Sequence, residues 1–150
     1  MEVRATDLSE PEVVSLIQLH LAEMHEASPP GTDHALDESG LSEEGIETYA
    51  AWDGGRLLAI GALKPHDDFV ELKSMRAHPD ARGTGAGKAI LTFLIERGRE
   101  LGVPTVKLET GSGPMFEAAL GLYRSFGFEP CGKFAQYEPG EFNQLFALEL

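Results

Sequence analysis

The feature that most constrains the fold is a glycine-rich loop between two regular patterns. In AHPDARGTGAGKAIL (residues 77–91), the alternate glycines Gly83, Gly85 and Gly87 follow a strand-like apolar run and precede an amphipathic helical pattern. PTVKLET (residues 104–110) then has the pattern of a second strand. A strand, a helix and another strand in this order favour a parallel crossover, with the loop at the end of a central strand.

The remaining patterns predict one α/β (α+β) domain over residues 1–150. Asp7 or Ser9 can cap a first helix that begins near Pro11 and ends near His25. The order of elements predicts a mixed, strongly twisted sheet of six to seven strands with helices on both faces. The predicted strands cover residues 1–6, 46–52, 56–64, 69–77, 104–110, 128–132 and 143–150, and the later helices cover residues 85–101 and a segment that opens at Pro114.

The alternation of apolar residues slips within the strand FVELKSMRA (residues 69–77). Val70 and Leu72 share one face, whereas Met75 and Ala77 share the other. A β-bulge between Leu72 and Met75 accounts for this slip, and such bulges often lie beside active sites.

The composition argues against several kinds of partner. The chain has a formal charge of −13, which disfavours nucleic-acid binding. No apolar run approaches the roughly 20 residues that span a membrane. The first residues lack the apolar core of a signal peptide, and the single cysteine, Cys131, permits no internal disulfide. We expect a cytoplasmic protein with no membrane partner and no metal, for which a homodimer is allowed.

Spacing excludes two common phosphate-binding loops. A mononucleotide loop requires a glycine where this chain has Arg82 and a hydroxyl residue where it has Ala89. A dinucleotide loop requires an acidic residue about 20 positions downstream of the glycines, but Val103 stands there and the loop lies in the middle of the chain.

The remaining pattern, R-x-x-G-x-G, resembles the coenzyme A loop of the Gcn5-related N-acetyltransferase (GNAT) superfamily. ALGLYRSFGF (residues 119–128) is similar to the second signature of that superfamily, and the order of elements agrees over nearly the whole chain. The segments SPP…HALD, KSMR and LETG resemble those of small bacterial YsnE-type members. The resemblance implies the GNAT fold, in which two central strands splay apart in a V, and acetyl-CoA as the co-substrate.

The resemblance also implies where the co-substrate binds. Unpaired N–H groups at a helix start attract phosphate, and glycines let the backbone approach it closely. The bulged strand supplies Met75 for the thioester carbonyl and Ala77 for the pantetheine arm. The residues expected at the loop are Arg82, Gly83, Thr84, Gly85, Ala86, Gly87 and Lys88.

Three residues are candidates for proton transfer. Tyr123 occupies the position of the general acid in the second signature, and its alternative role is that of a core aromatic. Glu71, four residues before Met75, and Glu109, at the end of the next strand, are competing general bases. Glu71 could equally be a polar residue on a solvated strand face.

The sequence indicates the residues that bind the acceptor substrate less clearly. The loop HEASPPGTDHALD suggests His25, Ser28 and His34 as pocket residues. Lys73 and Arg76 are unusual in a central strand, because an unpaired buried charge is costly. We therefore expect them either to face solvent across the bulge or to meet Glu71, Glu109 or a carboxylate of the substrate.

We interpret the chain as an acetyl-CoA-dependent N-acetyltransferase that acts on the primary amine of a small molecule by direct attack on the thioester. Two alternatives remain open at this point. The acceptor could be the amine of a protein or peptide, or the chain could be a non-catalytic module that binds acyl-CoA and regulates a partner.

Overall fold

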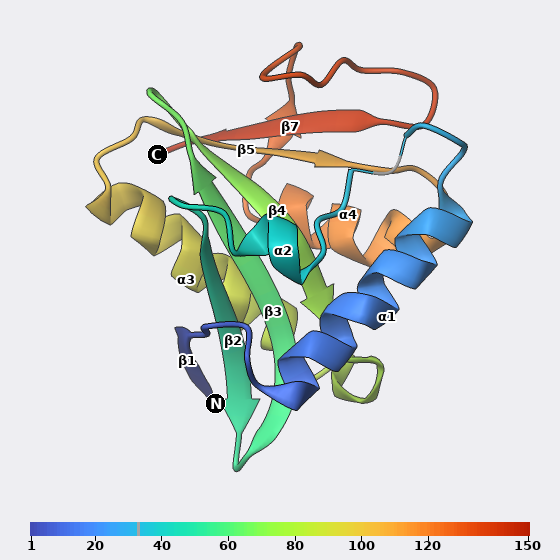
Figure 1. Ribbon diagram of the computed structural model, residues 1–150. Helices are drawn as coiled ribbons and strands as arrows, with labels where there is room; N and C mark the ends of the chain where they lie inside the picture. Colours follow the sequence, from blue (N-terminus) through green and yellow to red (C-terminus); the bar gives the residue numbers. More distant parts are fainter. Residues whose placement is uncertain (33) are drawn as a thin grey trace.

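The computed structural model describes residues 1–32 and 34–150, and seven strands in this part of the chain form one sheet (Figure 1). Their order is β1-β2-β3-β4-β5-β7-β6. β4 and β5 are parallel, and the other neighbours are antiparallel, so the predicted mixed sheet is confirmed. The strands are β1 (Glu2–Ala5), β2 (Glu47–Asp53), β3 (Arg56–Pro65), β4 (Val70–Ala77), β5 (Thr105–Thr110), β6 (Glu129–Pro130) and β7 (Gln144–Glu149).

Helices cover both faces of the sheet, as the sequence predicted (Figure 1). α1 (Pro11–Ala27) and α2 (Glu38–Leu41) pack on one face through Val13, Leu16, Ile17 and Leu41. α3 (Ala86–Glu100) and α4 (Glu117–Ser125) pack on the other through a separate core that contains Ile90, Leu91, Leu94 and Leu120. Of the described helices, none is long and apolar enough to cross a membrane.

The predicted β-bulge is present in β4. The register between β3 and β4 shifts at Gly61, which faces both Ser74 and Met75. Ser74 has a φ of 54°, a left-handed conformation that non-glycine residues seldom adopt. A Cβ on Gly61 would lie 2.8 Å from the Met75 sulfur and 2.6 Å from Ile90, so only glycine fits opposite the bulge.

The predicted splay begins just before the bulge. β4 and β5 pair over three residues, from Val70–Val106 to Leu72–Leu108. Beyond that point β4 remains paired with β3 and β5 remains paired with β7. The two central strands therefore separate and leave space between them.

Some local predictions were wrong. The N-cap of α1 is Glu10, which makes no side-chain cap bond, whereas Asp7 accepts hydrogen bonds from Ser9. Pro114 opens a short 3-10 helix (Pro114–Phe116) before α4 begins. β6 is only two residues long.

Candidate active site

A cavity of about 730 Å³ occupies the space between the separating strands. It extends from the glycine-rich loop, past the bulge of β4, to polar residues on β4 and β5. Most of the residues predicted for the site line this cavity: Ser28, His34, Glu71, Lys73, Met75, Arg76, Ala77, Arg82, Gly83, Gly87, Glu109 and Tyr123.

The other predicted residues lie off its wall: His25, Thr84, Gly85, Ala86 and Lys88. Thr84 donates its hydroxyl hydrogen bond to the Ala81 carbonyl at 2.5 Å, which holds the loop in shape. Lys88 lines a shallow hollow with Ala89 and Phe93 on another side of α3. His25 is an exposed residue near the end of α1.

The glycine-rich loop has the geometry of an anion cradle. Gly83 and Gly85 have φ values of 78° and 84°, and no atom lies within 4 Å of a Cβ built on either, so the requirement for glycine is conformational. Gly85 is the N-cap of α3 and makes no side-chain cap bond. The first N–H groups of α3 are therefore available to phosphate oxygens, and the residues present fit the diphosphate of coenzyme A.

Arg76 has a partner that the sequence did not predict. Its guanidinium lies 2.6 Å from the carboxylate of Glu23 on α1, and its Nε donates to the Ala77 carbonyl at 3.1 Å. The pair joins α1 to β4 beside the bulge. Next to it, the Ser74 hydroxyl is buried without a hydrogen bond among the described residues.

Tyr123 reaches the cavity from α4. Its side chain is buried and packs edge-on against Phe128, with the ring centroids 5.7 Å apart. Burial raises the pKa of the Tyr123 phenol well above its ordinary value of 10.0. The phenol therefore stays protonated at neutral pH.

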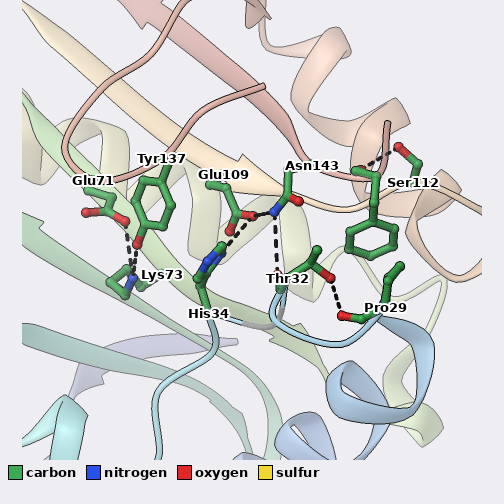
Figure 2. A network of polar contacts seen from close by, with 10 residues as sticks. Pro29, Thr32, His34, Glu71, Lys73, Glu109, Ser112, Tyr137 and Asn143 are labelled. Carbon is green, nitrogen blue, oxygen red and sulfur yellow. Dashed lines mark hydrogen bonds and ion pairs between the residues drawn. The ribbon is translucent and has the colours of Figure 1, made fainter. Parts of the chain in front are cut away.

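Glu71 and Lys73 form the first of two polar clusters (Figure 2). The Lys73 ammonium lies 3.1 Å from one oxygen of Glu71 and donates to the Tyr137 hydroxyl at 2.7 Å. The other oxygen of Glu71 lies 3.0 Å from Nε2 of His66. Burial, followed by the charge of Glu71, raises the pKa of Tyr137. Lys73 thus meets one of the predicted acids.

Glu109 is the centre of the second cluster. Nδ1 of His34 lies 3.1 Å from Oε2 of Glu109, and the side-chain amide of Asn143 donates to the same oxygen (Figure 2). Asn143 also reaches the Thr32 carbonyl at 3.5 Å. The segment between α1 and α2 is therefore attached to the ends of β5 and β7. Asp33, within that segment, lies outside the described residues.

Sequence reasoning missed Glu23, His66, Tyr137 and Asn143. They come from a helix, a turn and the segment before β7, and no spacing relates them to the glycine-rich loop. Only Glu23 gave a usable signal, because the odd placement of Arg76 in a strand already required an acid nearby. Among the described residues no group of histidine, cysteine and acidic side chains could hold a metal ion.

Comparison with known proteins agrees with this geometry. The sequence model described as "Acetyltransferase (GNAT) family" matches residues 13–128. YsnE of Bacillus subtilis, an uncharacterized N-acetyltransferase, is 41% identical over 91% of this chain and 91% of its own length. YedL of Escherichia coli, also an uncharacterized N-acetyltransferase, is 34% identical over 99% of this chain and 94% of its own length.

The solved structures include an acetyltransferase of Bacillus subtilis in complex with CoA. It superposes on this chain with a TM-score of 0.72 at 21% identity, and the match covers 99% of this chain and 98% of the other. At this level of identity the similarity concerns the fold.

Proposed function

Because this chain belongs to the acetyltransferase (GNAT) family and is an N-acetyltransferase, we propose that it acetylates the primary amine of a small molecule. The observation that carries the proposal is the continuous cavity from the glycine-rich loop to the two polar clusters. Ser28, Thr32 and His34 line its far end, and the segment that bears them is attached to Glu109 and Asn143. Such a covered end favours a small acceptor over a protein chain.

We propose that the glycine-rich loop and Arg82 bind the phosphates of acetyl-CoA, and that the bulge positions its reactive end. A β-bulge leaves a strand residue without its ladder partner. The Met75 N–H is therefore assigned to the thioester carbonyl and Ala77 to the pantetheine arm. Acetyl-CoA supplies an acyl thioester that an amine can attack directly.

The proton transfers are assigned to opposite ends of the cavity. As the amine nitrogen bonds to the carbonyl carbon and the carbon–sulfur bond breaks, Tyr123 gives its proton to the departing sulfur. Because burial raises the pKa of Tyr123, the phenol still carries its proton when negative charge develops on the departing sulfur. The proton of the amine leaves at the acceptor end, where Glu71 and Glu109 lie. Because Glu71 is engaged at both oxygens, we assign this step to Glu109 and its neighbours.

We also propose that the enzyme acts in the cytoplasm. Its single thiol, Cys131, cannot form an internal disulfide, which suits a reducing compartment.

A thiol-release assay tests the proposed function. Purified protein and acetyl-CoA are incubated with amino acids, polyamines, aminoglycosides and peptides, and reactions without an amine provide the background. We expect release of free thiol with a subset of the small amines. Turnover with peptides alone would favour a protein acceptor. Tight acetyl-CoA binding without turnover on any amine would favour the regulatory module.

A further inference from the structure

We propose that Nε2 of His34 accepts the proton of the acceptor amine and that Glu109 positions it, an inference that rests on the acetyl transfer proposed above. His34 lines the cavity, and about a third of its side chain is exposed (33%). It thus combines contact with the cavity and a fixed partner at its other ring nitrogen.

The contact with Glu109 determines which nitrogen is free. Nδ1 of His34 lies 3.1 Å from Oε2 of Glu109, which is 13% exposed. An ionised carboxylate only accepts hydrogen bonds, so Nδ1 must carry the proton in this contact. In the neutral ring Nε2 then holds the lone pair. A carboxylate at Nδ1 also stabilises the imidazolium that forms when Nε2 takes a proton.

Two further residues fix this arrangement. The Asn143 amide donates to the same oxygen of Glu109, and so limits rotation of the carboxylate. The Tyr137 ring packs edge-on against His34 at 5.1 Å between centroids. The imidazole is therefore held from both sides although it lies in a segment between helices.

Glu71 is arranged differently. One of its oxygens meets His66 at 3.0 Å and the other meets Lys73 at 3.1 Å, and its side chain is 3% exposed. A proton on either oxygen would disrupt one of these pairs and leave Lys73 with less compensation. We therefore infer that Glu71 positions Lys73.

The balance of the step is simple. The amine nitrogen forms the bond to carbon, its surplus proton passes to Nε2 of His34, and the departing sulfur takes the proton of Tyr123. His34 then releases its proton through the open side of the cavity, and Tyr123 regains one from solvent. No oxidant, reductant or metal is needed.

The pH dependence of this step follows from the groups that face His34. Glu109 faces it from β5 and Tyr137 from the segment between β6 and β7, while Lys73 and Glu71 of β4 lie beyond the Tyr137 hydroxyl. Turnover should fall at acidic pH, because a protonated Nε2 cannot accept the proton of the amine. Removal of the Glu109 charge destabilises the imidazolium and should move this fall to lower pH.

His34→Asn, Glu109→Gln and Glu141→Gln provide the kinetic test. The amide of asparagine can still donate a hydrogen bond to Glu109, but it has no basic nitrogen that could replace Nε2 of the imidazole. We expect kcat to fall about 100-fold or more and the acidic limb to disappear, with the Kd for CoA unchanged. In Glu109→Gln the acidic limb should persist at lower pH. Exposed Glu141 is the matched control, and its variant should behave as wild type.

The proposal would be overturned if the acidic limb of the pH profile persisted in His34→Asn and disappeared in Glu109→Gln. That result would identify the carboxylate of Glu109 as the base. A second readout does not depend on turnover. Nitrogen NMR of the wild-type protein should show neutral His34 protonated at Nδ1, and the opposite tautomer would overturn the proposal. If wild-type protein releases no thiol with any amine, the acetyl transfer itself has failed, and this tautomer still decides the arrangement of His34.

Discussion

Lys73 of β4 donates a hydrogen bond of 2.7 Å to the hydroxyl of Tyr137, a residue that lies 64 positions later in the chain. The same ammonium lies 3.1 Å from Glu71, and its side chain is only 9% exposed. The charge is thus compensated and hydrogen-bonded inside the protein. This contact connects the central sheet to the segment between β6 and β7.

Lys73→Met should destabilise the fold by about 3 kcal/mol, because removal of one partner leaves the other charge buried. Combining it with Glu71→Gln should recover much of that loss, since no buried charge then remains in the pair. Denaturant unfolding of the single and double variants measures both values. A loss below about 1 kcal/mol in Lys73→Met would show that solvent reaches Glu71 in solution.

Gly85→Val should weaken CoA binding at least about 10-fold, because a β-branched residue at a left-handed φ costs roughly 1–3 kcal/mol and shifts the loop. Gly45→Val is a matched control. Gly45 has a φ of 90° and, like Gly85, open space around a Cβ, but it lies between α2 and β2. Its variant should lose similar stability and retain CoA affinity, as measured by calorimetry. Equal affinities in both variants would exclude the loop from CoA binding.

Tyr123→Phe should lower kcat by about 100-fold, the usual contribution of a general acid, and leave the Kd for CoA within about twofold. The ring and its packing against Phe128 are retained, so stability should change little. Thiol release at saturating amine, with calorimetric binding as the control, separates the two effects. Full turnover in this variant would reduce Tyr123 to a core aromatic.

Stability should decline at alkaline pH. The pKa of each of the three tyrosines is raised in the folded protein; burial is the first cause at Tyr49, where the pKa is about 12. Folding therefore favours the protonated phenol, and this contribution is complete below the ordinary pKa of 10.0 and is lost above it. Tyr49→Phe should show a smaller decline between pH 10.0 and about 12 in denaturant unfolding. An identical decline in both proteins would contradict this account.

Most of the fold could be predicted because its signals are local. Alternation identified the strands, helical spacing identified α1 and α3, and the slip in residues 69–77 located the bulge. The cap of α1 was not predicted, because Asp7 and Ser9 fit the usual capping pattern, whereas the observed N-cap is Glu10, which makes no side-chain cap bond. Capping residues are often interchangeable in sequence.

The candidate site divides in the same way. The glycine-rich loop is continuous in sequence, so its geometry follows from a short motif. The partners of Lys73 and Glu109 come from segments far apart in the chain, and only the folded structure brings Tyr137, His34 and Asn143 to them. Long-range contacts of this kind leave no periodicity to detect.

The short pairing between β4 and β5 has a consequence for how the molecule bears load. Three residue pairs join β4 to β5, fewer than join β3 to β4 or β5 to β7, so the contact between the two halves of the sheet should resist shear less than those pairings. A ligand that fills the cavity would contact both halves and act as a brace between them. A ligand in the cavity should therefore increase the resistance to forced unfolding more than a ligand of the same affinity that binds to one half of the sheet alone. Only the ligand in the cavity carries force from one half to the other.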